Sequence, residues 1–335
     1  TMALVEEILL EPRWDEAEFE LLKRKQINEI DQQAGNPDAI ARREAAKLSY
    51  PADHIFSYLP YGTRDKLEAV ELSDLKAFYE ANYSPVRARL NIAGDVDAQT
   101  VATATTGLAA RWNTPGTEPV SLPPANPVEQ SAIYFYDVPG AKQSVLRIQR
   151  PSLSAVDPDY PLAEAMNFLL GGIYTSELNT ELRVNRGYTY GIRSGFSGQK
   201  DRGMFQIGSS VRANVTRESL ELIRDIVANY GPEFTEEDLA ILKGAVLRGQ
   251  ALENETLGAK LGVVWNISTY GYPDDFQARN AARVEDMTLD QFQQLAALYL
   301  RPDAMQYIVV GDAASQAELL SELGLGEPVM LEIVD

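Results

Sequence analysis

Apolar residues recur along this chain in two periods, one typical of strands and one typical of helices. Alternating apolar and polar residues over 131–137 and 143–149 predict two strands, and residues 193–212 predict two more around a glycine-containing turn. Helical spacing over 161–170 and 217–230 predicts two amphipathic helices. A further helix and a final strand follow. This order, with the helices grouped, predicts an α+β fold.

Two blocks of the pattern occur twice. Residues 12–23 and 232–243 each start with a proline and an aromatic residue, pass through an acidic first turn and continue with apolar residues at helical spacing. Residues 75–95 and 292–312 each predict a helix that stops before a proline, an apolar strand and a Gly-Asp turn. Their shared order indicates two homologous modules of roughly 210 to 220 residues, too long for a solenoid repeat.

A proline-rich linker over residues 114–127 separates these modules. We expect a complete module two over 128–335 and only the C-terminal part of module one over 1–113. Module two has about 105 residues before its proline-led helix and module one has only about 11, so we expect about 90 residues to be missing from the front of module one. The duplication also predicts that a helix over residues 16–23 superposes on one over 236–243, and that a strand over residues 90–95 superposes on one over 307–312.

Composition narrows the possible functions. The 335 residues carry a formal net charge of −19, which disfavours binding to phosphate backbones and makes nucleic acid an improbable partner. There is no cysteine, so disulfides, thiolate nucleophiles and cysteine metal sites are excluded. No apolar run approaches the roughly 18 residues that predict a membrane span. These observations fit a globular protein and leave its compartment open, periplasmic or cytoplasmic.

The candidate chemistry lies in residues 182–191, where Arg183 and Tyr190 stand seven residues apart around Gly187. An arginine presents fixed, permanently charged donors for a carbonyl or a developing oxyanion, and a tyrosine hydroxyl can donate to the same oxygen. The alternative is structural: Arg183 in an ion pair with Glu181 or Glu177, and Tyr190 half-buried in the core. The nearby Arg186 and Tyr188 could be confused with the pair, and the seven-residue spacing favours Arg183 with Tyr190.

This string resembles the substrate-gripping Arg…Tyr element of the pitrilysin/insulinase family of zinc peptidases. The resemblance covers nearly the whole chain. It also rests on the stretches 60–63, 67–68, 75–79, 82–85 and 91–96. It implies two similar domains, each an antiparallel-rich sheet with helices packed on one face.

The resemblance also implies roles for particular residues. Arg183 and Tyr190 would hydrogen-bond the substrate backbone. Gly171, Gly172 and Ser176 would shape the wall of the substrate cleft.

Active members of that family bind zinc through an inverted His-x-x-Glu-His motif and a downstream glutamate. The only histidine of this sequence is His54, so the motif is absent, and we interpret His54 as structural or exposed. Glu20 matches the downstream ligand, but Leu22 stands where a second acid is common. We therefore expect no metal site in this chain, with Glu20 a ligand only if a histidine pair lies upstream. A Ser-His-Asp triad lacks support for the same reason.

The resemblance predicts a non-catalytic, peptide-binding subunit of a heteromeric zinc endopeptidase. It would be inactive alone, would carry no cofactor, and would lend Arg183 and Tyr190 to a zinc-bearing pitrilysin-like partner. Two alternatives remain: a fragment of an active zinc peptidase whose motif lies upstream of Thr1, or a structural core-type subunit with no proteolytic role. Reading the coding sequence upstream of Thr1 would discriminate between the non-catalytic subunit and the fragment of an active peptidase.

Overall fold

The computed structural model describes residues 2–116, 120–252 and 254–332, and the chain clusters into two compact units. Unit 1 comprises Thr1–Gln33, Pro60–Leu122 and Glu253–Gly271. Unit 2 comprises Ala34–Leu59, Pro123–Leu252 and Tyr272–Asp335. Each unit therefore takes residues from both sides of the proline-rich linker.

Unit 2 is built on one mixed six-stranded sheet with the strand order β3-β4-β2-β5-β1-β6. The three pairings that join β3, β4, β2 and β5 are antiparallel, whereas β1 pairs in parallel with β5 and β6. The α+β class and the antiparallel-rich sheet were both predicted. The strands are β1 Ala132–Asp137, β2 Gln143–Ser152, β3 Thr189–Gly198, β4 Gly203–Arg212, β5 Gln306–Gly311 and β6 Val329–Met330.

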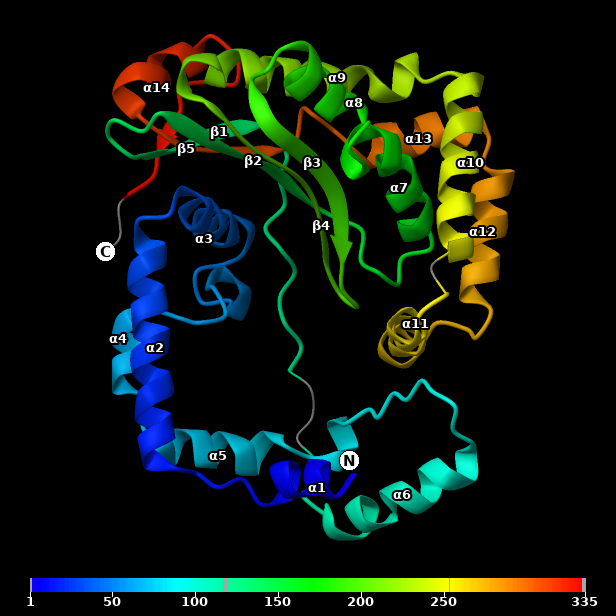
Figure 1. Ribbon diagram of the computed structural model, residues 1–335. Helices are drawn as coiled ribbons and strands as arrows, with labels where there is room; N and C mark the ends of the chain where they lie inside the picture. The colour runs from blue at the N-terminus through cyan, green and yellow to red at the C-terminus, as the bar shows by residue number, and fades with distance from the viewer. Residues whose placement is uncertain (1, 117–119, 253, 333–335) are drawn as a thin grey trace. The chain divides into compact units, whose positions relative to one another are not determined.

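The main core lies between one face of this sheet and a layer of helices that includes α7 Tyr160–Asn167, α9 Thr216–Glu233 and α13 Leu289–Tyr299 (Figure 1). Alternate strand residues point into this core, because successive side chains of a strand face opposite sides. The fully buried side chains of this core include Ile133, Phe135, Leu146, Ile148, Met166, Phe205 and Phe292.

The opposite face of the sheet is covered by α3 Pro37–Ser49, which packs against β2 and β5. Ile40 and Ala41 lie against Tyr136, Val145 and Val310 in a second, smaller core. The sequence predicts helices on one face only. The helical layer is confirmed. Helix α3 is an additional helix that the sequence analysis does not place on the sheet, because its short apolar stripe, mostly alanine, does not indicate which distant segment it packs against.

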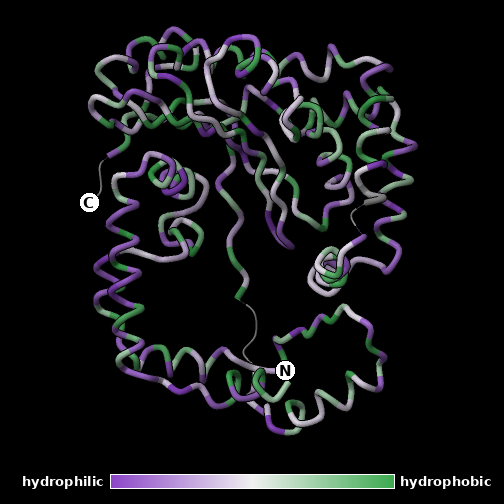
Figure 2. The backbone as a smooth tube through the Cα atoms, in the orientation of Figure 1, coloured by the Kyte–Doolittle hydropathy of each residue, from purple (hydrophilic) through white to green (hydrophobic). Residues whose placement is uncertain are grey.

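Unit 1 is helical among the residues described. Figure 2 shows hydrophobic and hydrophilic positions alternating along α2, which begins at Glu16 as the acidic first turn predicted. No helix of the described residues has the length and apolar character needed to cross a bilayer. The helices of unit 1 are α1 Met2–Leu10, α2 Glu16–Ala34, α4 Arg64–Ala69, α5 Leu72–Asn82, α6 Ala98–Arg111 and α11 Leu257–Tyr270. The last residue of α2, Ala34, is assigned to unit 2. The other helices of unit 2 are α8 Glu177–Asn179, α10 Glu236–Leu252, α12 Phe276–Asp286 and α14 Ala313–Ser321.

The predicted strand over residues 90–95 is not formed, and this prediction was wrong. Leu90 is 56% exposed and the segment has no regular secondary structure. A strand satisfies its backbone groups through a neighbouring strand, and the described residues of unit 1 include none. The matching segment of the second block does form a strand, β5, because β1 and β2 flank it.

Candidate functional site

Arg183 is carried by a short helical segment with an unusually wide turn. After α8, residues Thr180–Asn185 form a π-helical segment, η4, and a second π segment, η3, spans Phe168–Gly172 before it. Tyr174 lies on the turn between η3 and α8. Such wide turns are rare and are enriched at functional sites. The local backbone therefore brings Tyr174 and Arg183 to the same end of the sheet.

Tyr190 lies in a β-bulge near the start of β3. Thr189 pairs with Val211 and Ile192 pairs with Ser209, so β3 has one residue more than β4 between these pairs. The Thr189 hydroxyl donates to the Ser210 carbonyl oxygen at 2.8 Å, and the Ser209 hydroxyl donates to the Gly191 carbonyl oxygen at 3.0 Å. Bulges redirect side chains at strand ends. Tyr190 is accordingly 89% exposed.

The three side chains meet in what we call the Arg183 cluster, formed by Tyr174, Arg183 and Tyr190. The guanidinium carbon of Arg183 lies 4.6 Å from the centroid of the Tyr174 ring and 4.9 Å from that of Tyr190. Both distances are within the range of cation–π attraction. No carboxylate of the described residues forms an ion pair with Arg183, and Tyr190 is not a core residue. Among the described residues, Arg183 therefore contacts two aromatic rings and Tyr190 lies at the surface.

The turn that joins η4, which carries Arg183, to β3, which carries Tyr190, depends on Gly187. Its φ of +61° lies in the left-handed region, which only glycine adopts readily. The Tyr188 amide donates to the Leu182 carbonyl oxygen at 2.8 Å, which closes the helical segment. Of the two similar residues nearby, Arg186 is exposed and takes no part in the cluster, and Tyr188 is half-buried against the main core.

Gly171, Gly172 and Ser176 lie behind the cluster. A Cβ atom on Gly171 would come within 2.2 Å of the Ser194 hydroxyl oxygen and 2.6 Å of the Ser194 amide nitrogen, so glycine lets η3 touch β3 directly. The Gly172 carbonyl oxygen accepts a hydrogen bond from Arg193 at 3.3 Å. Ser176 is fully buried, and its hydroxyl has no hydrogen-bond partner among the described residues. In this structure these residues contribute to the frame that holds the cluster.

Two residues of the site were missed from the sequence, Tyr174 and Asn179. Asn179 is buried, its amide nitrogen donates to the Tyr174 carbonyl oxygen at 2.5 Å, and its amide oxygen accepts from the Ile192 amide at 3.3 Å. One side chain thus ties the turn of Tyr174 to the strand of Tyr190. Asn179 lies between Leu178 and Leu182, which are both fully buried. A polar residue among apolar ones was the feature of the sequence that could have pointed to it.

A pocket of about 450 Å³ beside α8 is lined by four acidic residues, Glu177, Glu181, Glu233 and Asp238. Partial burial of the carboxyl group, together with repulsion from Glu233, Glu181 and Asp238, raises the pKa of Glu177. This pocket holds negative charge close to the segment that carries Arg183. It contributes to the charge of the region without pairing with the arginine.

The described residues do not supply a zinc site. No group of three or more histidine, aspartate or glutamate side chains among them is arranged to hold a metal ion. His54 is structural: its Nδ1 accepts from the Phe56 amide at 3.0 Å, its Nε2 donates to the Pro123 carbonyl oxygen at 3.1 Å, and its ring stacks on Tyr50. Glu20 lies on α2 without the further ligands that zinc needs.

Comparison with known proteins agrees with this picture. Residues 69–246 match the family model described as the peptidase M16 inactive domain. A non-peptidase homolog of Helicobacter pylori is 21% identical over 315 residues, covering 92% of this chain and 71% of the relative. An uncharacterized zinc protease of Streptomyces coelicolor is 27% identical over 206 residues, covering 59% of this chain and 44% of the relative.

Among solved structures, the peptidase M16 inactive domain from Pseudomonas fluorescens superposes with a TM-score of 0.84 at 23% identity, covering 93% of this chain and 74% of that one. This similarity shows that the fold is shared. The family model itself matches more than half of the chain, including η3, the Arg183 cluster and the β3–β4 pair. The chain therefore belongs to the M16 peptidase family, as the resemblance to pitrilysin-type peptidases had predicted.

Proposed function

We propose that this chain is a non-catalytic, peptide-binding subunit that works with a zinc-bearing M16 partner and presents Arg183 and Tyr190 to the bound peptide. The observation that carries the proposal is the Arg183 cluster. A guanidinium is held between two exposed phenol rings with no carboxylate partner among the described residues. Its hydrogen-bond donors therefore remain available to a ligand.

The chemistry suits a peptide carbonyl group. An arginine keeps its charge at every physiological pH, and its planar fork can donate two hydrogen bonds to one or two oxygens. The Tyr190 hydroxyl adds a third donor from the opposite side of the turn. Such donors stabilise an oxyanion more than they stabilise the neutral carbonyl group from which it forms. The metal-activated water would come from the partner, because the described residues of this chain include no group of ligands that fits zinc.

The test mixes this chain with an M16 subunit that carries the zinc motif and measures cleavage of a fluorogenic peptide. We expect cleavage by the mixture to fall about a hundredfold with Arg183→Ala or Tyr190→Phe, since one oxyanion donor is worth ~3 kcal/mol. Size-exclusion chromatography should show unchanged assembly, because both side chains lie at the surface of the cluster.

Matched controls are provided by the neighbouring residues of the same type. Arg186→Ala and Tyr188→Phe alter the same turn but not the cluster, and both should leave cleavage within about twofold of the wild type, as expected for residues that contact no substrate. If Arg183→Ala and Tyr190→Phe also support wild-type cleavage, the assigned role is wrong. If cleavage does not depend on this chain at all, a structural role replaces the proposed one.

A further inference from the structure

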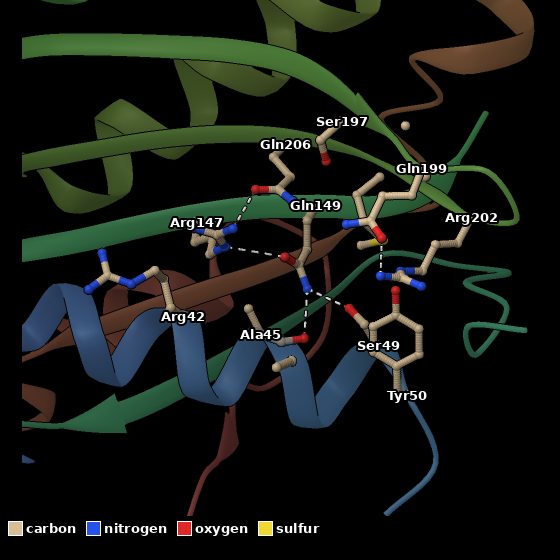
Figure 3. A pocket seen from close by; sticks show the side chains of 14 residues that line it. Arg42, Ala45, Ser49, Tyr50, Arg147, Gln149, Ser197, Gln199, Arg202 and Gln206 are labelled. Atoms are coloured by element: carbon tan, nitrogen blue, oxygen red, sulfur yellow. Dashed lines mark hydrogen bonds between the residues drawn. The ribbon is translucent and has the colours of Figure 1, made fainter. Parts of the chain in front are cut away.

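A second pocket lies on the face of the sheet opposite the main core, between α3 and strands β2, β3 and β4 (Figure 3). We call it the α3 pocket, and its volume is about 280 Å³. It uses no residue of the Arg183 cluster. Its lining includes guanidinium, amide and hydroxyl groups. The polar side chains used below are Arg42, Ser49, Arg147, Gln149, Arg202 and Gln206.

The frame of this pocket is fixed by Gln149, at the centre of Figure 3. Its amide nitrogen donates to the Ala45 carbonyl oxygen at 2.9 Å, to the Ser49 hydroxyl at 2.7 Å and to the Gln306 amide oxygen at 3.1 Å. These bonds join the helix to the sheet from the inside. Gln149 is buried, so the pocket is a built feature of the α3–sheet interface and not a surface fold of mobile side chains.

Arg147 and Arg42 form the charged end of the pocket. Arg147 donates from Nε to the Gln149 amide oxygen at 3.3 Å and from Nη2 to the Gln206 amide oxygen. Neither arginine has a carboxylate within 4.0 Å among the described residues. Burial and the charge of Arg42 lower the pKa of Arg147, and the charge of Asp38 offsets this only in part.

The arginine at the other end of the pocket is already engaged. Arg202 lies 3.4 Å from the Asp201 carboxylate, donates to Gln199, and stacks over the Phe56 ring at 3.3 Å. Arg42 and Arg147 differ because neither has a carboxylate within 4.0 Å among the described residues, and Arg147 donates only to the neutral side chains of Gln149 and Gln206. This contrast locates the unbalanced charge at one end of the pocket.

A half-buried guanidinium without a counter-ion raises the free energy of the folded state, because desolvation is not offset by an ion pair. The protein carries a net charge of −19 and still places two arginines here with no ion pair among the described residues, although Asp38 lines the adjoining hollow with both. We propose that the α3 pocket binds an oxyanion group, a carboxylate or a phosphate, through Arg42 and Arg147. The planar forks of two arginines match either group, and the surrounding amides can bind the remainder of a small ligand.

Isothermal titration calorimetry on the purified full chain tests this proposal with three probes: an N-acetylated alanine dipeptide with a free C-terminal carboxylate, its C-terminal amide, and inorganic phosphate. Binding of the acid but not the amide identifies a carboxylate site, and binding of phosphate alone identifies a phosphate site. Either result supports an oxyanion pocket. Affinity should also fall with ionic strength, because the contact is between charges.

The variants decide whether the binding belongs to this pocket. Arg42→Gln and Arg147→Gln should each weaken binding about tenfold or more, whereas Arg147→Lys keeps the charge, loses the fork and should have an intermediate effect. Lys200→Gln removes one charge from the exposed β3–β4 turn outside the pocket and should change affinity by less than about twofold.

Arg42 is exposed on α3, so its substitution preserves the fold and keeps the test decisive even if Arg147→Gln unfolds. No binding of any probe at millimolar concentration would overturn the proposal. Equal affinity of the wild type and the Arg42→Gln variant would do so as well.

Discussion

Substitution of Gly171 by alanine tests whether the Arg183 cluster depends on direct contact between η3 and β3. The added Cβ would lie 2.2 Å from the Ser194 hydroxyl oxygen, 2.6 Å from the Ser194 amide nitrogen and 2.8 Å from the Ser194 Cβ. The hydroxyl cannot rotate away without losing its 2.5 Å hydrogen bond to the Asn167 amide oxygen. The amide nitrogen belongs to the strand backbone and has no freedom of its own.

The segment η3 must therefore move away from β3. Overpacking of this kind costs about 1 to 3 kcal/mol, and the backbone contact places Gly171→Ala near the upper end of that range. Gly195→Ala is the matched control, because Gly195 lies one residue after Ser194 in β3 and a Cβ added there would have no heavy atom within 4 Å. A glycine inside a strand loses more conformational entropy on folding than an alanine does. Gly195→Ala should therefore stabilise the protein by about 0.5 kcal/mol or leave its stability unchanged.

Chemical denaturation followed by circular dichroism measures the difference in stability. Hydrogen exchange measured by mass spectrometry then shows whether peptides covering residues 189–196 open faster in Gly171→Ala, as they should if η3 no longer supports β3. Adding Ser194→Gly removes two of the three short contacts and should restore part of the stability. Equal stability of Gly171→Ala and Gly195→Ala would refute the reasoning.

Two further predictions concern the neighbours of the cluster. Asn179→Ala should destabilise the protein by about 1 to 3 kcal/mol, because it leaves the Ile192 amide without its partner, whereas Asn185→Ala on the exposed side should have little effect; thermal unfolding distinguishes them. Glu177→Gln should raise the melting temperature at pH 8. The raised pKa of Glu177 means that the folded state holds its proton more tightly, so ionisation destabilises the fold as pH rises from 4.5 through the raised value. The gain should vanish below pH 4.5, and a gain that is the same at every pH would contradict this account.

Local pattern predicted most of unit 2. Helices α9 and α10 and strands β1 to β5 were each expected from the period of their apolar residues, although β3 begins at Thr189, four residues before the stretch that predicted it. Residues 90–95 did not form the predicted strand and β5 did, and both outcomes have the same cause. An apolar stretch becomes a strand only where neighbouring strands pair with it, and a single segment does not reveal whether those neighbours are in place.

Contacts between residues far apart in the sequence set the second limit on what could be predicted. Packing of α3 on β2 brings Ala45 and Gln149 together across 104 positions, and nothing in either segment specifies the other. The α3 pocket was therefore invisible in the sequence. Asn179 was missed for a related reason, because its role is to connect two turns whose proximity is known only once β3 and α8 have been placed.

The bulge at Tyr190 shows how one local irregularity decides which way a side chain points. In β3 the even-numbered residues Ile192, Ser194 and Phe196 are buried, so strict alternation would place Tyr190 in the core as well. That was the structural alternative to a binding role. The extra residue between Thr189 and Ile192 breaks the alternation and turns the ring outward, where it meets Arg183. The two interpretations of Tyr190 therefore differ by a single inserted residue. The hydroxyl groups of Thr189 and Ser209 hold that insertion in place, which makes them part of the machinery that aims the phenol.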